Sequence, residues 1–190
     1  MTTKQPNLNL PNTITVLRIF ATPIVLWLLL TDRGELGPER WWGAILFIIF
    51  MASDAFDGYW ARSRGLVTDL GKLLDPIADK VLTGGALVVL SILGELPWWV
   101  TIVVLIREIG ITIHRLLAAH TVVLAAAWLG KVKTVLQSIA IPLAIVPHWI
   151  WTGEPGIWVN TLIMSAAVVM TIVSGIDYIV KLPAAKKKAE

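Results

Sequence analysis

Apolar residues run along this chain in long stretches that polar residues interrupt only briefly. Six stretches approach the roughly 20 residues that a helix needs to cross the hydrocarbon of a bilayer. They cover residues 14–31, 41–62, 72–94, 97–118, 133–151 and 157–180. Because the connecting segments are short, the pattern predicts an all-α integral membrane protein with six transmembrane helices in a single bundle, formed by one domain over residues 1–190.

The composition favours the same class. Hydrophobic residues make up 56% of the chain and charged residues 15%, and the mean hydropathy is +0.75, well above the usual range of a soluble domain. A polar segment without a small-residue cleavage site precedes the first stretch, so we expect that stretch to remain as a helix rather than to be a removable signal peptide. The absence of cysteine excludes disulfides and thiolate chemistry.

The placement of lysine and arginine predicts an orientation. With the N-terminus in the cytoplasm, the outer loops contain only Arg33 and Arg40, and the other fourteen of the sixteen basic residues fall on the inner half. The positive-inside rule therefore places both termini in the cytoplasm. The net charge of +3 and the lysines at 186–188 then favour contacts with anionic membrane lipids over binding of nucleic acid.

Four acidic residues lie at the inner ends of the second and third stretches, on either side of the loop at residues 63–71. They are Asp54, Asp57, Asp75 and Asp79. A charged side chain at membrane depth is costly and is a functional hypothesis by default. On helices, the first pair shares one face and the second pair repeats at i, i+4, so the two pairs can converge. Because mutual repulsion opposes ionisation of four acids together, we expect bound cations.

The ligand chemistry narrows the metal and the reaction. An all-oxygen set without histidine or cysteine favours Mg²⁺, Mn²⁺ or Ca²⁺ over zinc or copper. Two such ions about 3.5–4 Å apart can clamp a phosphoryl group during an in-line displacement. On the same helical face, Gly58 and Ala61 leave space for a ligand, and Arg62 at its margin supplies donors for phosphate oxygens. The pattern predicts a phosphoryl-transfer site that uses two Mg²⁺ or Mn²⁺ ions.

These residues also match a known signature. The segment 54–62 has the form DxxDGxxAR, and the segment 71–79 follows with GxxxDxxxD. The chain therefore resembles the CDP-alcohol phosphotransferase family. The resemblance covers the whole chain and implies six transmembrane helices, a homodimer and, for a bacterial member, a place in the inner (cytoplasmic) membrane with the active site facing the cytoplasm. It also implies an enzyme in which an alcohol attacks the lipid-side phosphorus of a CDP-linked lipid and releases CMP.

The family suggests a role for each position. Asp54, Asp57 and Asp75 look like ligands of a two-metal centre, and Asp79 looks like both a ligand of the second metal and the base for the acceptor hydroxyl. The expected contacts of the CDP-linked lipid, CDP-diacylglycerol, include the glycines and small residues of the signature and an N-terminal segment similar to the family's nucleotide contact. These residues are Asn12, Thr15, Gly58, Ala61, Arg62, Thr68 and Gly71.

A second group of basic residues indicates an anionic acceptor. Arg107 and Arg115 fall on a similar face of the fourth stretch, and Lys131 and Lys133 open the fifth. We expect them to bind the phosphate of the acceptor, although the two lysines also suit membrane-interface anchors. Together with the signature, these segments resemble the bacterial branch of the family whose acceptor is sn-glycerol 3-phosphate. Inositol phosphate and phosphatidylglycerol, the acceptors of other branches, stay open.

Acids within membrane helices are also compatible with a function of another class. A divalent-cation transporter likewise uses carboxylates within the membrane to bind its ions. A transport pathway needs polar groups along the bundle, whereas these acids lie at one end and the first and fifth stretches offer few polar residues. The sequence therefore favours the enzyme.

Overall fold

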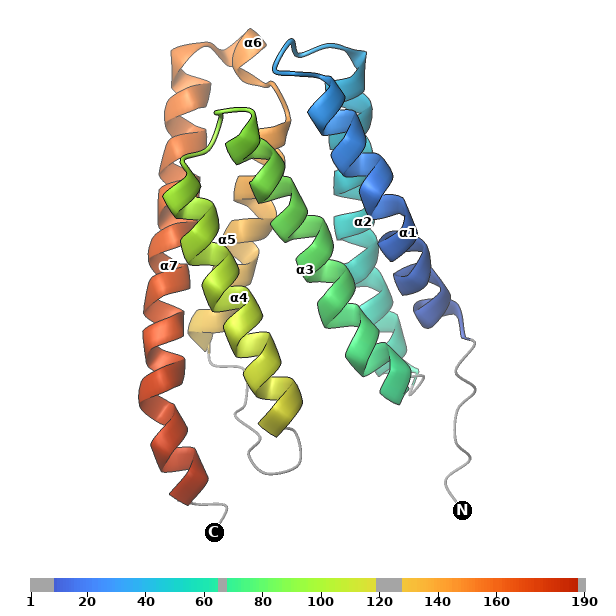
Figure 1. Ribbon diagram of the computed structural model, residues 1–190, viewed down its shortest axis with the longest axis vertical. Coiled ribbons are helices and arrows are strands. Elements are labelled where there is room, and N and C mark those ends of the chain that lie inside the picture. Colours follow the sequence, from blue (N-terminus) through green and yellow to red (C-terminus); the bar gives the residue numbers. More distant parts are fainter. Residues whose placement is uncertain (1–8, 65–67, 119–127, 188–190) are drawn as a thin grey trace. The chain divides into compact units, whose positions relative to one another are not determined.

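The computed structural model describes residues 9–64, 68–118 and 128–187, and within these ranges it leaves out the side chains of Ala61, Arg62, Asp69, Ala118 and residues 183–187. The described residues form helices and no strands (Figure 1). The helices are α1 (Leu10–Thr31), α2 (Pro38–Ser63), α3 (Asp69–Ile92), α4 (Trp98–Ala118), α5 (Trp128–Ile145), α6 (Trp149–Thr152) and α7 (Glu154–Lys187). The chain divides into two compact units, Met1–Leu93 and Gly94–Glu190, which are described in turn.

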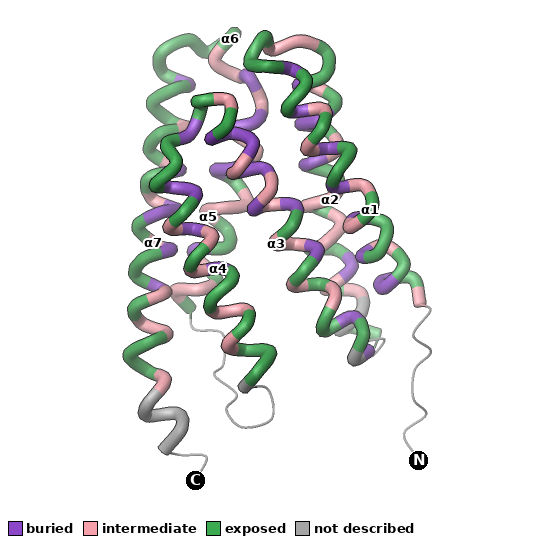
Figure 2. Tube along the Cα trace, viewed as in Figure 1, coloured by how far each residue is buried: buried purple, intermediate pink, exposed green. Residues whose placement is uncertain are grey.

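In the first unit, α1 packs against both α2 and α3. The Asn9 side chain caps α1 by accepting a hydrogen bond from the Asn12 amide at 3.0 Å. The buried positions of α1 recur every three or four residues, as expected for one helix face in contact with its neighbours (Figure 2). They are Pro11, Asn12, Thr15, Arg18, Thr22, Val25 and Leu29.

Glycine allows the helices of this unit to approach closely. A Cβ atom added at Gly43 of α2 would lie 2.6 Å from Leu29 Cδ2, and one added at Gly85 of α3 would lie 2.5 Å from Leu26 Cδ1. Both distances are too short for real carbon atoms, so the leucines of α1 occupy space that any larger residue would fill. Small residues at contacts between helices are typical of membrane proteins, where backbone proximity increases van der Waals packing.

In the second unit, α4, α5 and α6 each pack against α7. The buried face of α5 runs from Lys133 to Ala140, Ile141, Ala144 and Ile145. The sequence predicted one helix over 133–151, and this boundary is wrong, because α5 ends at Ile145 and the short α6 begins separately at Trp149. Pro147 explains the break, since proline lacks an amide hydrogen and disfavours helical backbone at the residue before it.

Three of the six predicted spans correspond to described helices whose length and composition suit a membrane-crossing helix. Among the described helices, α1, the Pro38–Trp60 part of α2 and the Glu154–Leu182 part of α7 are long and apolar enough to cross a membrane. The other three long helices, α3, α4 and α5, contain most of the charged residues connected with function, while Asp54 and Asp57 lie on α2. The same residues that suggest a site therefore lower the apolar character of the helices that contain them.

Candidate functional site

The acids of the signature lie on two neighbouring helices of the first unit. Asp54 and Asp57 are in the last turns of α2, and Asp75 and Asp79 are in the first half of α3. The charges of Asp75 and Asp79 act on Asp54, and those of Asp54 and Asp75 act on Asp57. The structure therefore brings the two predicted pairs into mutual electrostatic range.

A polar stripe on α1, formed by Asn12, Thr15 and Arg18, contacts the regions that carry these acids. Asn12 Nδ2 donates a hydrogen bond to Thr68 Oγ1 at 2.7 Å, and Thr15 Oγ1 donates to Asp75 Oδ1 at 2.7 Å. The same Thr68 hydroxyl oxygen caps α3 by accepting from the Gly71 amide at 3.0 Å. The start of α1 is thus tied to the start of α3 through Thr68 and to Asp75. In the sequence, only the family resemblance indicates that Asn12 and Thr15 belong to the site.

Arg18 is the residue of the site that the sequence analysis missed. Its guanidinium donates to Asp54 Oδ1 through Nη1, and through Nη2 to Asp57 Oδ2 at 3.3 Å and Ser53 Oγ at 3.1 Å. The expectation that the first stretch offers little polar chemistry is therefore incomplete. A charged residue four positions inside a predicted span was the signal that could have revealed it.

The four acids have separate partners. Asp54 and Asp57 accept from Arg18, Asp75 accepts from Thr15, and Asp79 Oδ2 accepts from Lys80 Nζ at 2.5 Å. Across the described residues, no three histidine, cysteine or acidic side chains come together as a ready-made metal site. Each acid uses one carboxylate oxygen in these contacts, which leaves its second oxygen outside the hydrogen bonds of the described residues.

The remaining predicted contacts of the donor lipid lie on α2 and α3. Gly58 is half-buried in α2, one residue after Asp57, while the side chains of Ala61 and Arg62 lie outside the described part of the chain. Gly71 is buried at the start of α3, where an added Cβ would lie 2.6 Å from Asn12 Oδ1 and 3.2 Å from Thr68 Oγ1. A larger residue at position 71 would therefore displace the Asn12 side chain from its hydrogen bond with Thr68.

In the second unit, the predicted phosphate-binding residues divide into two groups. Arg107 and Lys133 share one partner: Glu108 Oε1 accepts from Arg107 Nη1 at 2.8 Å and from Lys133 Nζ at 2.6 Å. Arg107 Nη2 also donates to Ser174 Oγ at 3.1 Å, while its buried Nε has no partner among the described residues. These two cations and one anion, of which Glu108 and Lys133 are buried, join α4, α5 and α7 and together have a net positive charge.

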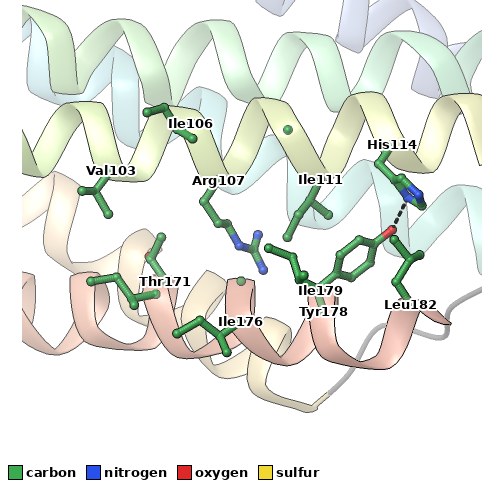
Figure 3. A pocket seen from close by; sticks show the side chains of 13 residues that line it. Val103, Ile106, Arg107, Ile111, His114, Thr171, Ile176, Tyr178, Ile179 and Leu182 are labelled. Atoms are coloured by element: carbon green, nitrogen blue, oxygen red, sulfur yellow. Dashed lines mark hydrogen bonds between the residues drawn. The ribbon is translucent and has the colours of Figure 1, made fainter. Parts of the chain in front are cut away.

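Arg115 and Lys131, by contrast, are exposed. The Arg115 guanidinium lies over the ring of Tyr178, 5.5 Å from its centroid, and the Tyr178 hydroxyl is hydrogen-bonded to His114 Nδ1 at 2.8 Å. Figure 3 shows this bond beside a pocket of about 520 Å³ formed by α4 and α7. Arg107 extends into the pocket from α4 between mainly apolar side chains.

The fold and the site together define a class: a helical membrane protein with four acids on two neighbouring helices and a polar face of a third helix that contacts them. Comparison with known proteins gives the family. The profile of the family described as CDP-alcohol phosphatidyltransferase matches residues 8–173, and the chain belongs to this family. It is accordingly a transferase, and the alternative of a cation transporter has no support.

Similar proteins cover nearly the whole chain. A protein of Bacillus subtilis named CDP-diacylglycerol–glycerol-3-phosphate 3-phosphatidyltransferase is 42% identical, with 91% of this chain and 94% of that protein aligned. A probable phosphatidylglycerophosphate synthase of Mycobacterium tuberculosis is 39% identical over 91% of this chain and 81% of its own length. A Rickettsia bellii protein with the same name as the Bacillus protein is 36% identical over 90% of this chain and 93% of its own length.

Proposed function

We propose that this protein is a phosphatidylglycerophosphate synthase, which transfers the phosphatidyl group of CDP-diacylglycerol to sn-glycerol 3-phosphate and releases CMP. The observation that carries the proposal is the 42% identity, over nearly the full length of both chains, to a Bacillus subtilis protein whose name states this donor and this acceptor. The Mycobacterium and Rickettsia relatives have names of the same meaning. These names favour glycerol 3-phosphate over inositol phosphate and phosphatidylglycerol.

The proposed cofactor is a pair of Mg²⁺ or Mn²⁺ ions held by Asp54, Asp57, Asp75 and Asp79. The chemistry of the donor set supports this, because all four ligands are hard oxygen donors and each keeps one carboxylate oxygen outside the hydrogen bonds of the described residues. When bound, such ions offset the negative charge of the phosphate oxygens of the donor lipid.

The chain's own residues accept the proton and bind the two substrates. Asp79, with Lys80 beside it, takes the proton of the acceptor hydroxyl. The acceptor oxygen forms a bond to the lipid-side phosphorus, and the bond between that phosphorus and the CMP oxygen breaks. The donor lipid is held by residues of the first unit, namely Asn12, Thr15, Gly58, Ala61, Arg62, Thr68 and Gly71.

The acceptor has no recognition group other than hydroxyls and one phosphate, so it needs positive charge. We assign its phosphate to Arg107, Arg115, Lys131 and Lys133. The net positive charge of the Arg107, Glu108 and Lys133 group and the unpartnered Nε of Arg107 support this assignment.

The proposal includes the setting of the enzyme. All six long helices span a bacterial cytoplasmic membrane as one bundle, with both termini and the active site on the cytoplasmic side, and the chain works as a homodimer. The arrangement of basic residues in the sequence supports this orientation.

One assay tests the reaction. The purified full-length protein is given CDP-diacylglycerol and Mg²⁺ together with glycerol 3-phosphate, inositol phosphate or phosphatidylglycerol in turn, and release of CMP is measured. We expect release with glycerol 3-phosphate only. Preferred release with either other acceptor would overturn the assignment of the acceptor, and metal flux into vesicles without CMP release would overturn the enzyme itself.

A further inference from the structure

Arg18 is the only arginine that the described part of α1 contains, and it is almost entirely inaccessible, with a side chain 1% exposed. An arginine side chain cannot lose its proton in a protein, so it is a permanent positive charge inside this unit. A buried charge of this kind is expensive unless ionic partners and hydrogen bonds satisfy it. Its partners are the two acids that begin the family signature, Asp54 and Asp57.

Each of the two acids contacts Arg18 through only one of its two carboxylate oxygens. Arg18 Nη1 reaches Asp54 Oδ1, and Nη2 reaches Asp57 Oδ2. The planar fork of a guanidinium holds both carboxylates in a defined orientation, which a lysine ammonium cannot do. Ser53 Oγ, at 3.1 Å from Nη2, fixes the fork from the same helix that carries the acids.

The environment of the two acids differs. The Asp54 side chain is 40% exposed and the Asp57 side chain 9% exposed, so Arg18 links a largely buried carboxylate to a more accessible one. Side chains that hydrogen-bond metal ligands orient them and commonly alter metal affinity about 10- to 100-fold when removed. Nothing in the sequence signature assigns such a residue on α1.

We infer that Arg18 is a positioning residue for the metal site: its guanidinium fork, braced by Ser53, holds one oxygen of Asp54 and of Asp57 so that the other oxygen of each is directed to a divalent cation. The inference rests on the proposed metal role of the acids. It assigns to α1 a function beyond packing and beyond contact with the donor lipid.

The experiment measures Mn²⁺ binding to the full-length protein in detergent by electron paramagnetic resonance, without substrate. Arg18→Lys keeps the charge and removes the fork, and we expect Mn²⁺ to bind about 10- to 100-fold more weakly. Ser53→Ala leaves every charge in place and should weaken binding in the same direction but less. The Mg²⁺ concentration that gives half-maximal CMP release should rise in both variants.

Arg40→Lys is the matched control. Arg40 is also a fully buried arginine of the first unit, and its Nη1 lies 3.9 Å from an oxygen of Asp32. We expect this variant to lower the melting temperature while its folded fraction binds Mn²⁺ as the unaltered protein does. This separates loss of stability from loss of metal binding.

Three results would overturn the inference. Unchanged Mn²⁺ affinity in Arg18→Lys and Ser53→Ala would make Arg18 a structural residue only. Tighter binding in either variant would make it a competitor of the metal. If the unaltered protein bound no Mn²⁺, the proposed metal role of the acids would fail first, and the inference with it. Because Ser53→Ala removes only one hydroxyl, it decides the question even if Arg18→Lys does not fold.

Discussion

At the scale of single residues, the site depends on a few polar side chains that satisfy one another in an apolar surrounding. Thr68 satisfies two hydrogen-bond donors at once, because its hydroxyl oxygen accepts from the Gly71 amide and from the Asn12 side chain. Thr15 plays a comparable part for Asp75. A buried polar group left without its partner costs about 1–3 kcal/mol, so loss of one member disturbs its neighbours as well.

Neutralising the acids should remove activity without unfolding the protein. We expect Asp54→Asn, Asp75→Asn and Asp79→Asn each to lower CMP release by at least about 100-fold, because each removes a proposed metal ligand or the base. Asp32→Asn is the control, since Asp32 is a buried acid of the same unit that accepts from the Gly37 amide at 2.7 Å. It should reduce stability while the folded protein keeps its activity. Substantial residual activity in all three Asn variants would contradict the proposed mechanism.

Gly71 provides a test of the donor-lipid contacts. Gly71→Ala places a methyl group against Asn12 Oδ1 and should break the Asn12–Thr68 hydrogen bond, which raises the KM for CDP-diacylglycerol and destabilises the protein by about 1–3 kcal/mol. Gly110→Ala in α4 is the control, because a Cβ there meets nothing within 4 Å. Thermal melting and KM for both substrates are the measurements. Equal effects of the two changes would show that the local crowding at Gly71 is irrelevant.

How much of the site could be predicted depends on the kind of signal. The spacing of the acids placed them on two neighbouring helices, and in the structure the two pairs lie within electrostatic range of each other. Arg18 was missed because the interpretation followed the acids and treated the first stretch as apolar. Its role depends on a contact 36 residues along the chain to Asp54, and no local pattern encodes such a contact.

At the scale of elements, charged side chains of one helix are paired with polar or charged side chains of a neighbouring helix. In the first unit α1 supports the acids of α2 and α3, and in the second unit Glu108 of α4 joins Lys133 of α5. Lys133 is 3% exposed, so its charge depends on that acid. Removing one partner of a buried ion pair typically costs about 3–5 kcal/mol, whereas removing both is much less harmful.

A pair of variants can separate the structural role of Lys133 from binding of the acceptor. Lys133→Gln should destabilise the protein and raise the KM for glycerol 3-phosphate about tenfold or more, with little change for CDP-diacylglycerol. The double variant Glu108→Gln/Lys133→Gln should be more stable than Glu108→Gln alone, because it leaves one cation of the group, Arg107, without its acidic partner rather than two, but it should keep the raised KM. Arg107→Ala should raise the same KM, and exposed Lys181→Ala should not. An unchanged KM for glycerol 3-phosphate in Lys133→Gln and in the double variant would make Lys133 a structural residue.

At the scale of the whole molecule, the hydropathy of single helices indicates fewer membrane spans than the proposed topology contains. Length and composition support three spans, α1, α2 and α7, while the distribution of basic residues supports six. The difference comes from α3, α4 and α5, where some of the acidic and basic side chains have hydrogen-bond or ionic partners within their own unit. Asp75 with Thr15 and Glu108 with Lys133 are examples. Single-helix hydropathy cannot register such pairing, because it counts a charge as exposed wherever it lies.

The chain contains no cysteine, so single introduced cysteines can determine the topology without background labelling. We propose Glu35→Cys, Ser63→Cys, Glu95→Cys, Glu154→Cys and Lys181→Cys, all at exposed positions near helix ends. With six spans, a membrane-impermeant maleimide should label positions 35, 95 and 154 in intact cells, and positions 63 and 181 only after permeabilisation. With three spans, positions 95 and 154 would remain protected with position 63, and position 181 would be labelled from outside. CMP release by each variant shows that the labelled protein is folded. Because α7 would cross in the opposite direction with three spans, position 181 decides between the two topologies even if labelling near α4 is inefficient.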